Sequence, residues 1–201
     1  MSILYNTVGA NSNQFDTVQL TKITSLGSLV GWIGTIVLAA VLGSVTSLDY
    51  TVVGITLFWL VLSGAVVAYA GPATPQVIRQ NLVWKYWLGA SAVGIVINIG
   101  AALLVIGGVF NGTPIQETAP MQYGVMLPWL AIYAGGYLLP ALYRRSSPAL
   151  NTAERAIYGV AGALSLALTA LLAVMPSVYP VSVLALAVVS LAPLLTLRYR
   201  G

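Results

Sequence analysis

The sequence predicts an all-α protein, a polytopic transmembrane helical bundle of six spans arranged as three helical hairpins. Hydrophobic residues make up 59% of its 201 residues and charged residues only 6%, whereas a soluble domain carries about 25% charged residues. The few charges leave uncharged runs that are long enough to cross a membrane, and the basic residues all fall on one side of the resulting topology. This composition excludes a soluble globular enzyme.

The charged residues define where the spans lie. Long uncharged runs lie between Lys22 and Asp49, Asp49 and Arg79, Lys85 and Glu117, and Glu117 and Arg144, and a still longer run extends from Ala156 to Leu197. A helix needs roughly 20 apolar residues to cross the hydrocarbon layer. The longest run must hold two spans, because Pro176 and Pro180 indicate a turn within it. Six spans are therefore predicted, at 24–46, 51–70, 86–109, 122–143, 153–175 and 178–197.

The spans form one six-helix transmembrane domain over residues 23–201, preceded by a polar cytoplasmic N-terminal segment over residues 1–22. They are expected to pair as hairpins over 24–70, 86–143 and 153–197. The segment that precedes Lys22 lacks the apolar stretch of a cleavable signal peptide. The first span is therefore expected to act as its own insertion signal.

The distribution of basic residues predicts the orientation. The loops at 47–50, 110–121 and 176–180 contain no basic residue, and all eight basic residues fall on the side of the two termini: Lys22, Arg79, Lys85, Arg144, Arg145, Arg155, Arg198 and Arg200. Because cytoplasmic loops carry the excess of Lys and Arg, both termini are predicted to be cytoplasmic. The net charge of +4 is then a topology signal that also suits anionic lipid headgroups, and no nucleic-acid partner is expected.

Small residues recur at every fourth position in the odd-numbered spans and predict close helix packing there. In the first span these positions are Gly27, Gly31, Thr35, Ala39 and Gly43; in the third, Ala90, Gly94, Asn98 and Ala102; in the fifth, Gly159, Ala163 and Ala167. Such faces let a neighbouring backbone approach closely, either within the chain or between chains. The candidate helix-packing residues are therefore Gly27, Gly31, Gly43, Gly94 and Asn98.

Asn98 is the most polar side chain deep within a predicted span. Exposed to lipid, its amide would be left without hydrogen-bond partners at a cost of several kcal/mol, so it is expected to face the bundle. There it makes either an interhelical hydrogen bond, worth about 1 kcal/mol, or a contact to a solute or pigment. The sequence favours the hydrogen bond.

Other side chains mark span ends or packing positions. Asn151 followed by Glu154 predicts a capping box that opens the fifth span, and Pro140 predicts a kink near the end of the fourth. Trp59 lies near the middle of the second span and is expected to be a packing residue. The aromatic residues where the third span begins are expected at the membrane interface: Trp84, Tyr86 and Trp87.

The chain lacks the residues that most membrane chemistry needs. It contains no histidine and no cysteine, which removes the common general base, haem ligand and thiol nucleophile. Its four carboxylates lie at the flanks of the predicted spans, which disfavours a metal site, an aspartyl protease and ion-coupled transport. We therefore expect no catalytic residue, no cofactor and no metal.

The sequence Asn111-Gly112-Thr113 matches the pattern of an N-glycan acceptor on the predicted extracytoplasmic side. It follows the third span so closely that we expect Asn111 to remain unmodified and the match to be a chance one.

Two functional classes remain. The first is a non-enzymatic structural or accessory subunit that packs in a larger membrane assembly, in a cell or in a virus or vesicle membrane, with protein partners or self-association through its small-residue faces. The alternative is a passive channel or facilitator for a small neutral solute, which needs only a pore lined by hydroxyls, amides and backbone. The absence of a polar stripe that matches the small-residue faces favours the subunit.

The predicted topology is tested by placing single cysteines at Asn111 and at Ser147 and labelling them from each side of the membrane. Since three spans precede the first position and four precede the second, the two sites should be labelled from opposite sides. Labelling of both from the same side would contradict the six-span topology.

Overall fold

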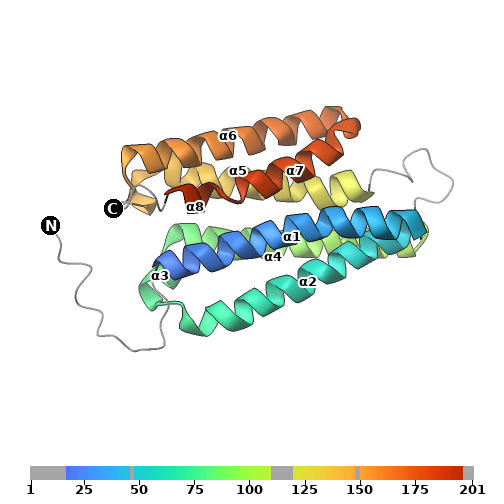
Figure 1. Cartoon of the computed structure of the whole chain (residues 1–201), viewed down its shortest axis with the longest axis horizontal. Helices are drawn as coiled ribbons and strands as arrows, with labels where there is room; N and C mark the ends of the chain where they lie inside the picture. The colour runs from blue at the N-terminus through green and yellow to red at the C-terminus, as the bar shows by residue number, and fades with distance from the viewer. Residues whose placement is uncertain (1–16, 46–47, 110–119, 148–149, 197–201) are drawn as a thin grey trace.

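The computed structural model describes residues 17–45, 48–109, 120–147 and 150–196, and over these residues the chain is all-helical (Figure 1). The elements are α1 (Thr17–Val45), α2 (Leu48–Ala73), α3 (Gln76–Gln80), α4 (Leu82–Ile106), η1 (Pro120–Met126), α5 (Leu127–Leu142), η2 (Arg144–Ser146), α6 (Thr152–Val174), η3 (Pro176–Val178), α7 (Tyr179–Val189) and α8 (Ala192–Thr196). Six stretches are long and apolar enough to span a membrane: Gln19–Val45, Tyr50–Ala73, Leu82–Ile106, Gln122–Leu142, Thr152–Val174 and Tyr179–Thr196. The predicted six-span fold class is confirmed, and the chain is an integral, multi-pass membrane protein in contact with lipid.

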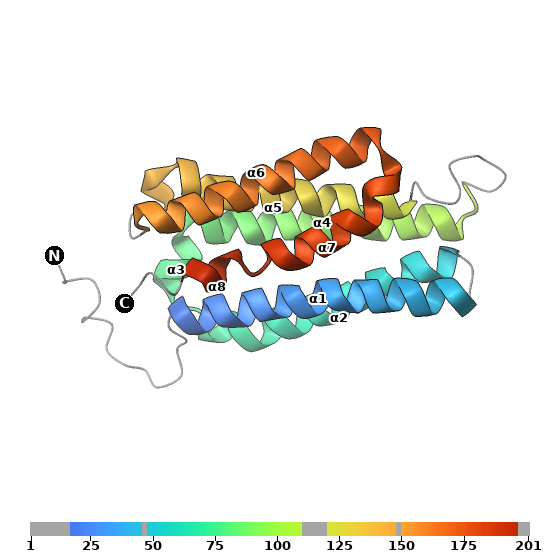
Figure 2. The same ribbon diagram turned by 45° about the horizontal axis from the view of Figure 1, so that its top comes forward.

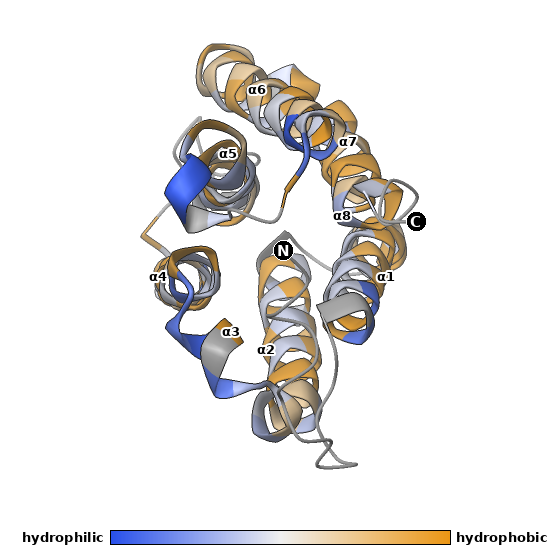
Figure 3. Ribbon diagram, turned by 90° about the vertical axis from the view of Figure 1, so that its left-hand side faces the viewer, coloured by the Kyte–Doolittle hydropathy of each residue, from blue (hydrophilic) through white to orange (hydrophobic). Residues whose placement is uncertain are grey.

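The six spans form a closed ring in chain order. Each span contacts the next, from α1 and α2 through α4, α5 and α6 to α7, and the ring closes where α7 and α8 contact α1. The end-on view in Figure 3 shows this arrangement, and Figure 2 shows α7 crossing between α6 and α1. The ring places the inward faces of all six spans around a common centre.

The predicted arrangement as three helical hairpins is not confirmed, because the contacts do not single out the predicted pairs. The paired spans do contact each other, but the most extensive contact joins α5 and α6, which belong to different predicted hairpins. Gly162 explains the closeness of that contact, because a Cβ there would lie 2.9 Å from the backbone nitrogen of Leu138. The glycine lets the two helices approach almost to backbone contact.

Several boundaries differ from the predicted ones. Helix α1 begins at Thr17, within the segment assigned to the polar N-terminus, and the predicted loop after the second span contains the short helix α3. Pro75 separates α2 from α3, since the residue before a proline disfavours the helical conformation. Arg79 then donates hydrogen bonds to the carbonyls of Gly71, Pro72 and Thr74 at the end of α2.

The sixth span is broken into α7 and α8. Pro193 has no N–H to donate and its ring clashes with the carbonyl four residues earlier, which is that of Val189. Helix α7 accordingly ends at Val189, and α8 begins at Ala192. The hydroxyl of Ser190 donates to the carbonyl of Ala187 at 2.7 Å and supports the break.

Local sequence explains the other helix ends. Asn151 and Glu154 make the predicted capping box, with reciprocal backbone hydrogen bonds of 2.8 and 2.9 Å at the start of α6. Helix α4 ends in a Schellman motif, in which Gly108 adopts a φ of 68° that glycine tolerates. In that motif the Gly108 N–H donates to Val105 and the Val109 N–H to Leu104.

The small-residue faces contact other helices to very different degrees. A Cβ at Gly31 would lie 2.7 Å from Cζ3 of Trp59, and one at Gly94 would lie 2.8 Å from Cδ1 of Ile132. A Cβ at Gly27 would lie 3.2 Å from Val66, whereas one at Gly43 would meet nothing within 4 Å. The predicted contact face of the first span therefore does not reach Gly43 within this chain.

The fifth span corrects the prediction further. Ala163 and Ala167 are exposed on the outside of the ring, whereas the inward face of α6 carries Gly162, Ser165 and Leu168. The four-residue spacing therefore identified small residues that do not pack within this chain, because small residues lie on both faces of this helix.

Replacing Gly31 by Leu should lower the free energy of unfolding by about 1–3 kcal/mol, because the new side chain would overlap the ring of Trp59. Gly43→Leu is the matched control, since it makes the same change in the same helix where space is open. Reversible unfolding in detergent measures both variants. Equal stabilities for the two would contradict the packing role of Gly31.

Candidate functional site

The centre of the ring is occupied by aromatic side chains, which we call the aromatic core. Its members come from four spans: Trp32 on α1, Trp59 on α2, Trp87 on α4, and Trp129, Tyr133 and Tyr137 on α5. Trp32 is fully buried, and only Trp87 among the six is partly exposed. The chain therefore places its bulkiest side chains where a channel would need open space.

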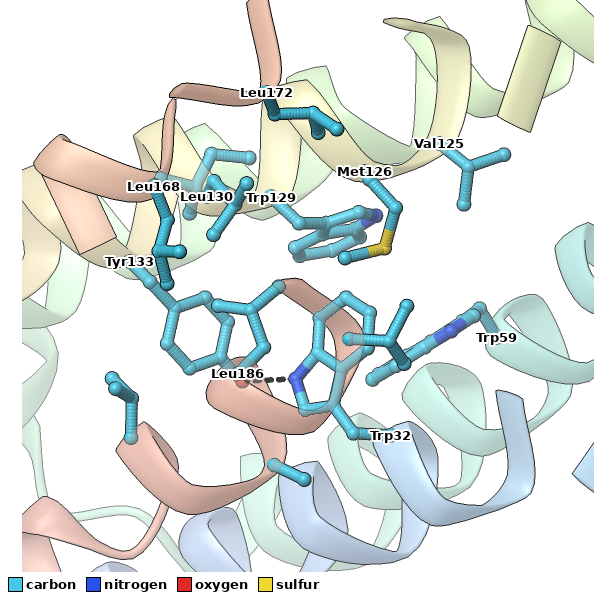
Figure 4. Packing of buried hydrophobic residues seen from close by; sticks show 14 of the residues in the cluster. Trp32, Trp59, Val125, Met126, Trp129, Leu130, Tyr133, Leu168, Leu172 and Leu186 are labelled. Carbon is cyan, nitrogen blue, oxygen red and sulfur yellow. Dashed lines mark hydrogen bonds between the residues drawn. The ribbon is translucent and has the colours of Figure 1, made fainter. Parts of the chain in front are cut away.

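Three tryptophans meet at the middle of the aromatic core (Figure 4). The ring centroids of Trp32 and Trp59 are 4.9 Å apart, and Trp129 stacks on Trp59 at 5.5 Å with an interplanar angle of 23°. Trp32 meets Trp129 edge-on at 6.3 Å. Offset and edge-on aromatic pairs each contribute about 0.5–1.5 kcal/mol beyond the area they bury. The contacts among these three rings thus stabilise the packing of α1, α2 and α5 against one another.

Each indole N–H of this trio has a hydrogen-bond acceptor on another span. Trp32 Nε1 donates to the Tyr133 hydroxyl at 3.1 Å, and Trp59 Nε1 donates to the Thr35 hydroxyl at 2.9 Å. The Thr35 hydroxyl in turn donates to the Gly31 carbonyl at 2.9 Å. Within lipid an unpaired indole N–H would cost several kcal/mol, so these bonds fix which faces of α1, α2 and α5 meet.

Asn98 lies inside the bundle and is almost fully buried. Its Oδ1 accepts a 2.8 Å hydrogen bond from Trp129 Nε1, and its Nδ2 donates to the Gly124 carbonyl. Gly124 belongs to the π-helical segment η1, whose wider turn changes the backbone hydrogen-bonding pattern. Asn98 therefore joins α4 both to the aromatic core and to the beginning of the fourth span.

The aromatic core continues toward the end of the ring that carries α3. Trp87 meets Tyr133 at 5.1 Å and Tyr137 at 5.6 Å, and Tyr137 meets Tyr158 of α6 at 5.7 Å. A Cβ at Gly136 would overlap the Trp87 ring. This glycine leaves the space that Trp87 occupies.

Gly135 has the same role toward Tyr86. A Cβ there would overlap the Tyr86 hydroxyl, which donates at 3.1 Å to the Ile132 carbonyl. Tyr86 and Trp87 thus pack against α5 in the first two turns of α4, and their position at the membrane interface stays a prediction. Trp59, by contrast, is a buried packing residue as predicted.

Sequence reasoning missed most of this core, although one signal was available. Trp129, Tyr133 and Tyr137 recur at every fourth position and therefore lie on one face of a helix. Trp32, Trp59 and Trp129 also lie in the middle of their spans, where aromatic residues do not serve as interface anchors. Of the predicted site residues, Gly31, Gly94 and Asn98 adjoin the core, and Asn111 lies outside the described residues.

The described residues offer few groups for chemistry. Glu154 is buried, and its Oε2 accepts from the Asn151 backbone in the capping box. No group of three potential metal ligands occurs among the residues that the structure describes. What the arrangement does provide is a packed interior in which tryptophan, tyrosine and asparagine side chains are joined by hydrogen bonds.

Comparisons with protein-family models, curated proteins and solved structures found no match to this chain.

The Asn98–Trp129 bond is tested by a double-mutant cycle with Asn98→Leu and Trp129→Phe. Asn98→Leu should lower the free energy of unfolding by about 1–3 kcal/mol, because it leaves the Trp129 N–H and the Gly124 carbonyl unpaired. The coupling energy should be about 1 kcal/mol. Trp84→Phe is the matched control, since Trp84 lies in the first turn of the same helix, several turns from Asn98, and should show no coupling to it. A cycle with Trp129 that gives zero coupling would contradict the assigned bond.

Proposed function

We propose that the protein is a non-enzymatic structural or accessory subunit that packs with itself or with other proteins in a membrane assembly. The observation that carries the proposal is the filled aromatic core at the centre of the ring. A passive facilitator needs a polar path along that axis. Here the axis holds three tryptophan rings in mutual contact, and the only polar atom of each side chain is already hydrogen-bonded to the protein.

The outward surface of α6 supports a packing role. Small residues spaced alternately by three and four positions form a continuous stripe that faces away from the ring, and we call it the α6 seam. Its members are Ala153, Ala156, Val160, Ala163, Ala167, Ala170 and Val174, all of them exposed. This spacing is that of the contact positions of left-handed helix pairs, and small side chains let membrane helices approach closely.

The rest of α6 explains why the seam faces outward. The inward positions Ser165 and Leu172 are fully buried against the ring. The Ser165 hydroxyl bonds the Ala161 carbonyl at 2.9 Å, so it does not need a partner from outside. The helix thus has one face for its own chain and an opposite face on which the narrow α6 seam lies beside the exposed Leu164, Leu166 and Leu171, and small residues flanked by leucines suit a neighbouring helix.

The double variant Ala163→Leu/Ala167→Leu should weaken the assembly, because it fills the α6 seam without altering the inward face. Ala40→Leu is the control, since Ala40 is an exposed alanine on α1, away from the seam. The measurement is the mass of the particle extracted in mild detergent, with its co-purifying components. The wild type and the control should form the larger particle, and the seam variant should lose it.

A facilitator would give a different result. If the wild type were monomeric without partners, and liposomes containing it swelled faster in urea or glycerol than empty liposomes, the proposal would be wrong.

A further inference from the structure

Basic side chains gather at one corner of the ring, at the end that carries α3. Figure 3 shows this end, with hydrophilic residues along α3, the start of α4 and the segment that follows α5. Arg79 is on α3, Lys85 is in the first turn of α4, and Arg144 and Arg145 form η2 after α5. All four are exposed. We call these four residues the basic corner.

The contact between α4 and α5 brings the parts of the basic corner together. Tyr86 packs so closely on Gly135 that a Cβ there would overlap its hydroxyl. The start of α4 therefore lies beside the last turns of α5. Lys85 directly precedes Tyr86, and Arg144 follows the end of α5. The two segments therefore reach the membrane surface side by side.

The positive charge of the basic corner is not neutralised by the described part of the chain. At this end of the ring the one described carboxylate is that of Glu154, which is buried and used in the capping box. The Arg79 guanidinium bonds backbone carbonyls, which leave its charge in place. A surface of four such cations attracts anionic groups from outside the described chain.

The basic corner is also held in place. Arg155 donates from Nη1 to the Pro140 carbonyl at 2.7 Å and from Nη2 to the Ser147 carbonyl at 2.6 Å. These two carbonyls lie on either side of η2, so Arg155 fixes the segment that carries Arg144 and Arg145. An anion that binds there does not have to order the loop first.

Apolar side chains lie directly on the membrane side of these cations. Leu88 of α4 and Leu142 at the end of α5 are exposed, and Leu142 is exposed by 76%. Tyr143, next to Leu142, is also exposed and suits the headgroup level. A ligand for this surface therefore needs an anionic head and an apolar body beside it.

We propose that the basic corner, with the exposed leucines next to it, binds anionic phospholipid, with the lipid phosphate on Lys85, Arg144 and Arg145. A free phosphate would satisfy the cations but would leave the leucines unused. The lipid stabilises the end of the ring at which α4 and α5 meet. This binding does not depend on the assembly proposed above, since it involves α3–α5 and η2 rather than the α6 seam.

The experiment measures lipid adducts by native mass spectrometry on the full chain in mild detergent. Phosphatidylglycerol, phosphatidylcholine and inorganic phosphate are the three probes. The wild type should retain phosphatidylglycerol in preference to the other two. The triple variant Lys85→Gln/Arg144→Gln/Arg145→Gln should bind phosphatidylglycerol roughly 100-fold more weakly, at about fivefold for each basic residue near a membrane surface.

The control variant Lys22→Gln/Arg198→Gln/Arg200→Gln removes the same charge from other positions and should keep the wild-type preference. Three results would overturn the proposal: equal retention of phosphatidylglycerol and phosphatidylcholine by the wild type, binding of inorganic phosphate as strong as that of the lipid, or the same loss in both triple variants. A stable monomer that still retains phosphatidylglycerol would contradict the proposed assembly while supporting the lipid site.

Discussion

The indole N–H groups at the centre of the ring are the constraint on which the rest of this structure depends. Inside the hydrocarbon layer no water can pair them, so each must find an acceptor within the protein. The indole N–H of Trp59 on α2 donates a hydrogen bond to Thr35 on α1. That of Trp32 on α1 donates to Tyr133 on α5, and that of Trp129 on α5 donates to Asn98 on α4. These three bonds link four helices in a fixed register, and apolar contacts from α6 and α7 complete the ring.

The same constraint separates the inside of the molecule from its outside. Because the three central tryptophans use their indole N–H groups within the protein, we expect partner-binding surfaces on the outward faces and at the membrane-surface loops. The α6 seam offers small apolar side chains to another helix. The basic corner offers cations beside exposed leucines. The two surfaces differ in chemistry and lie on different elements, so they can be occupied at the same time.

The sequence alone predicted the features that depend on local composition. The six spans follow from uncharged runs, and the capping box at Asn151 follows from two residues that are three positions apart. The order of helices around the ring depends on contacts between distant residues, which single-helix patterns do not encode. Gly31 and Gly43 illustrate the limit, because they occupy equivalent positions of one stripe although only Gly31 meets another helix. Likewise, the contact between Trp87 and Gly136 joins two different helices and cannot be predicted from the pattern of either helix alone.

The central claim is that the aromatic core is closed to water. It is tested most directly by hydrogen–deuterium exchange of the indole N–H groups, followed by NMR on the protein in a lipid nanodisc. The account predicts slow exchange for Trp32, Trp59 and Trp129, because each N–H is buried and hydrogen-bonded to another span. Complete exchange of all three on transfer to D₂O would show that water reaches the centre of the ring and would contradict the account.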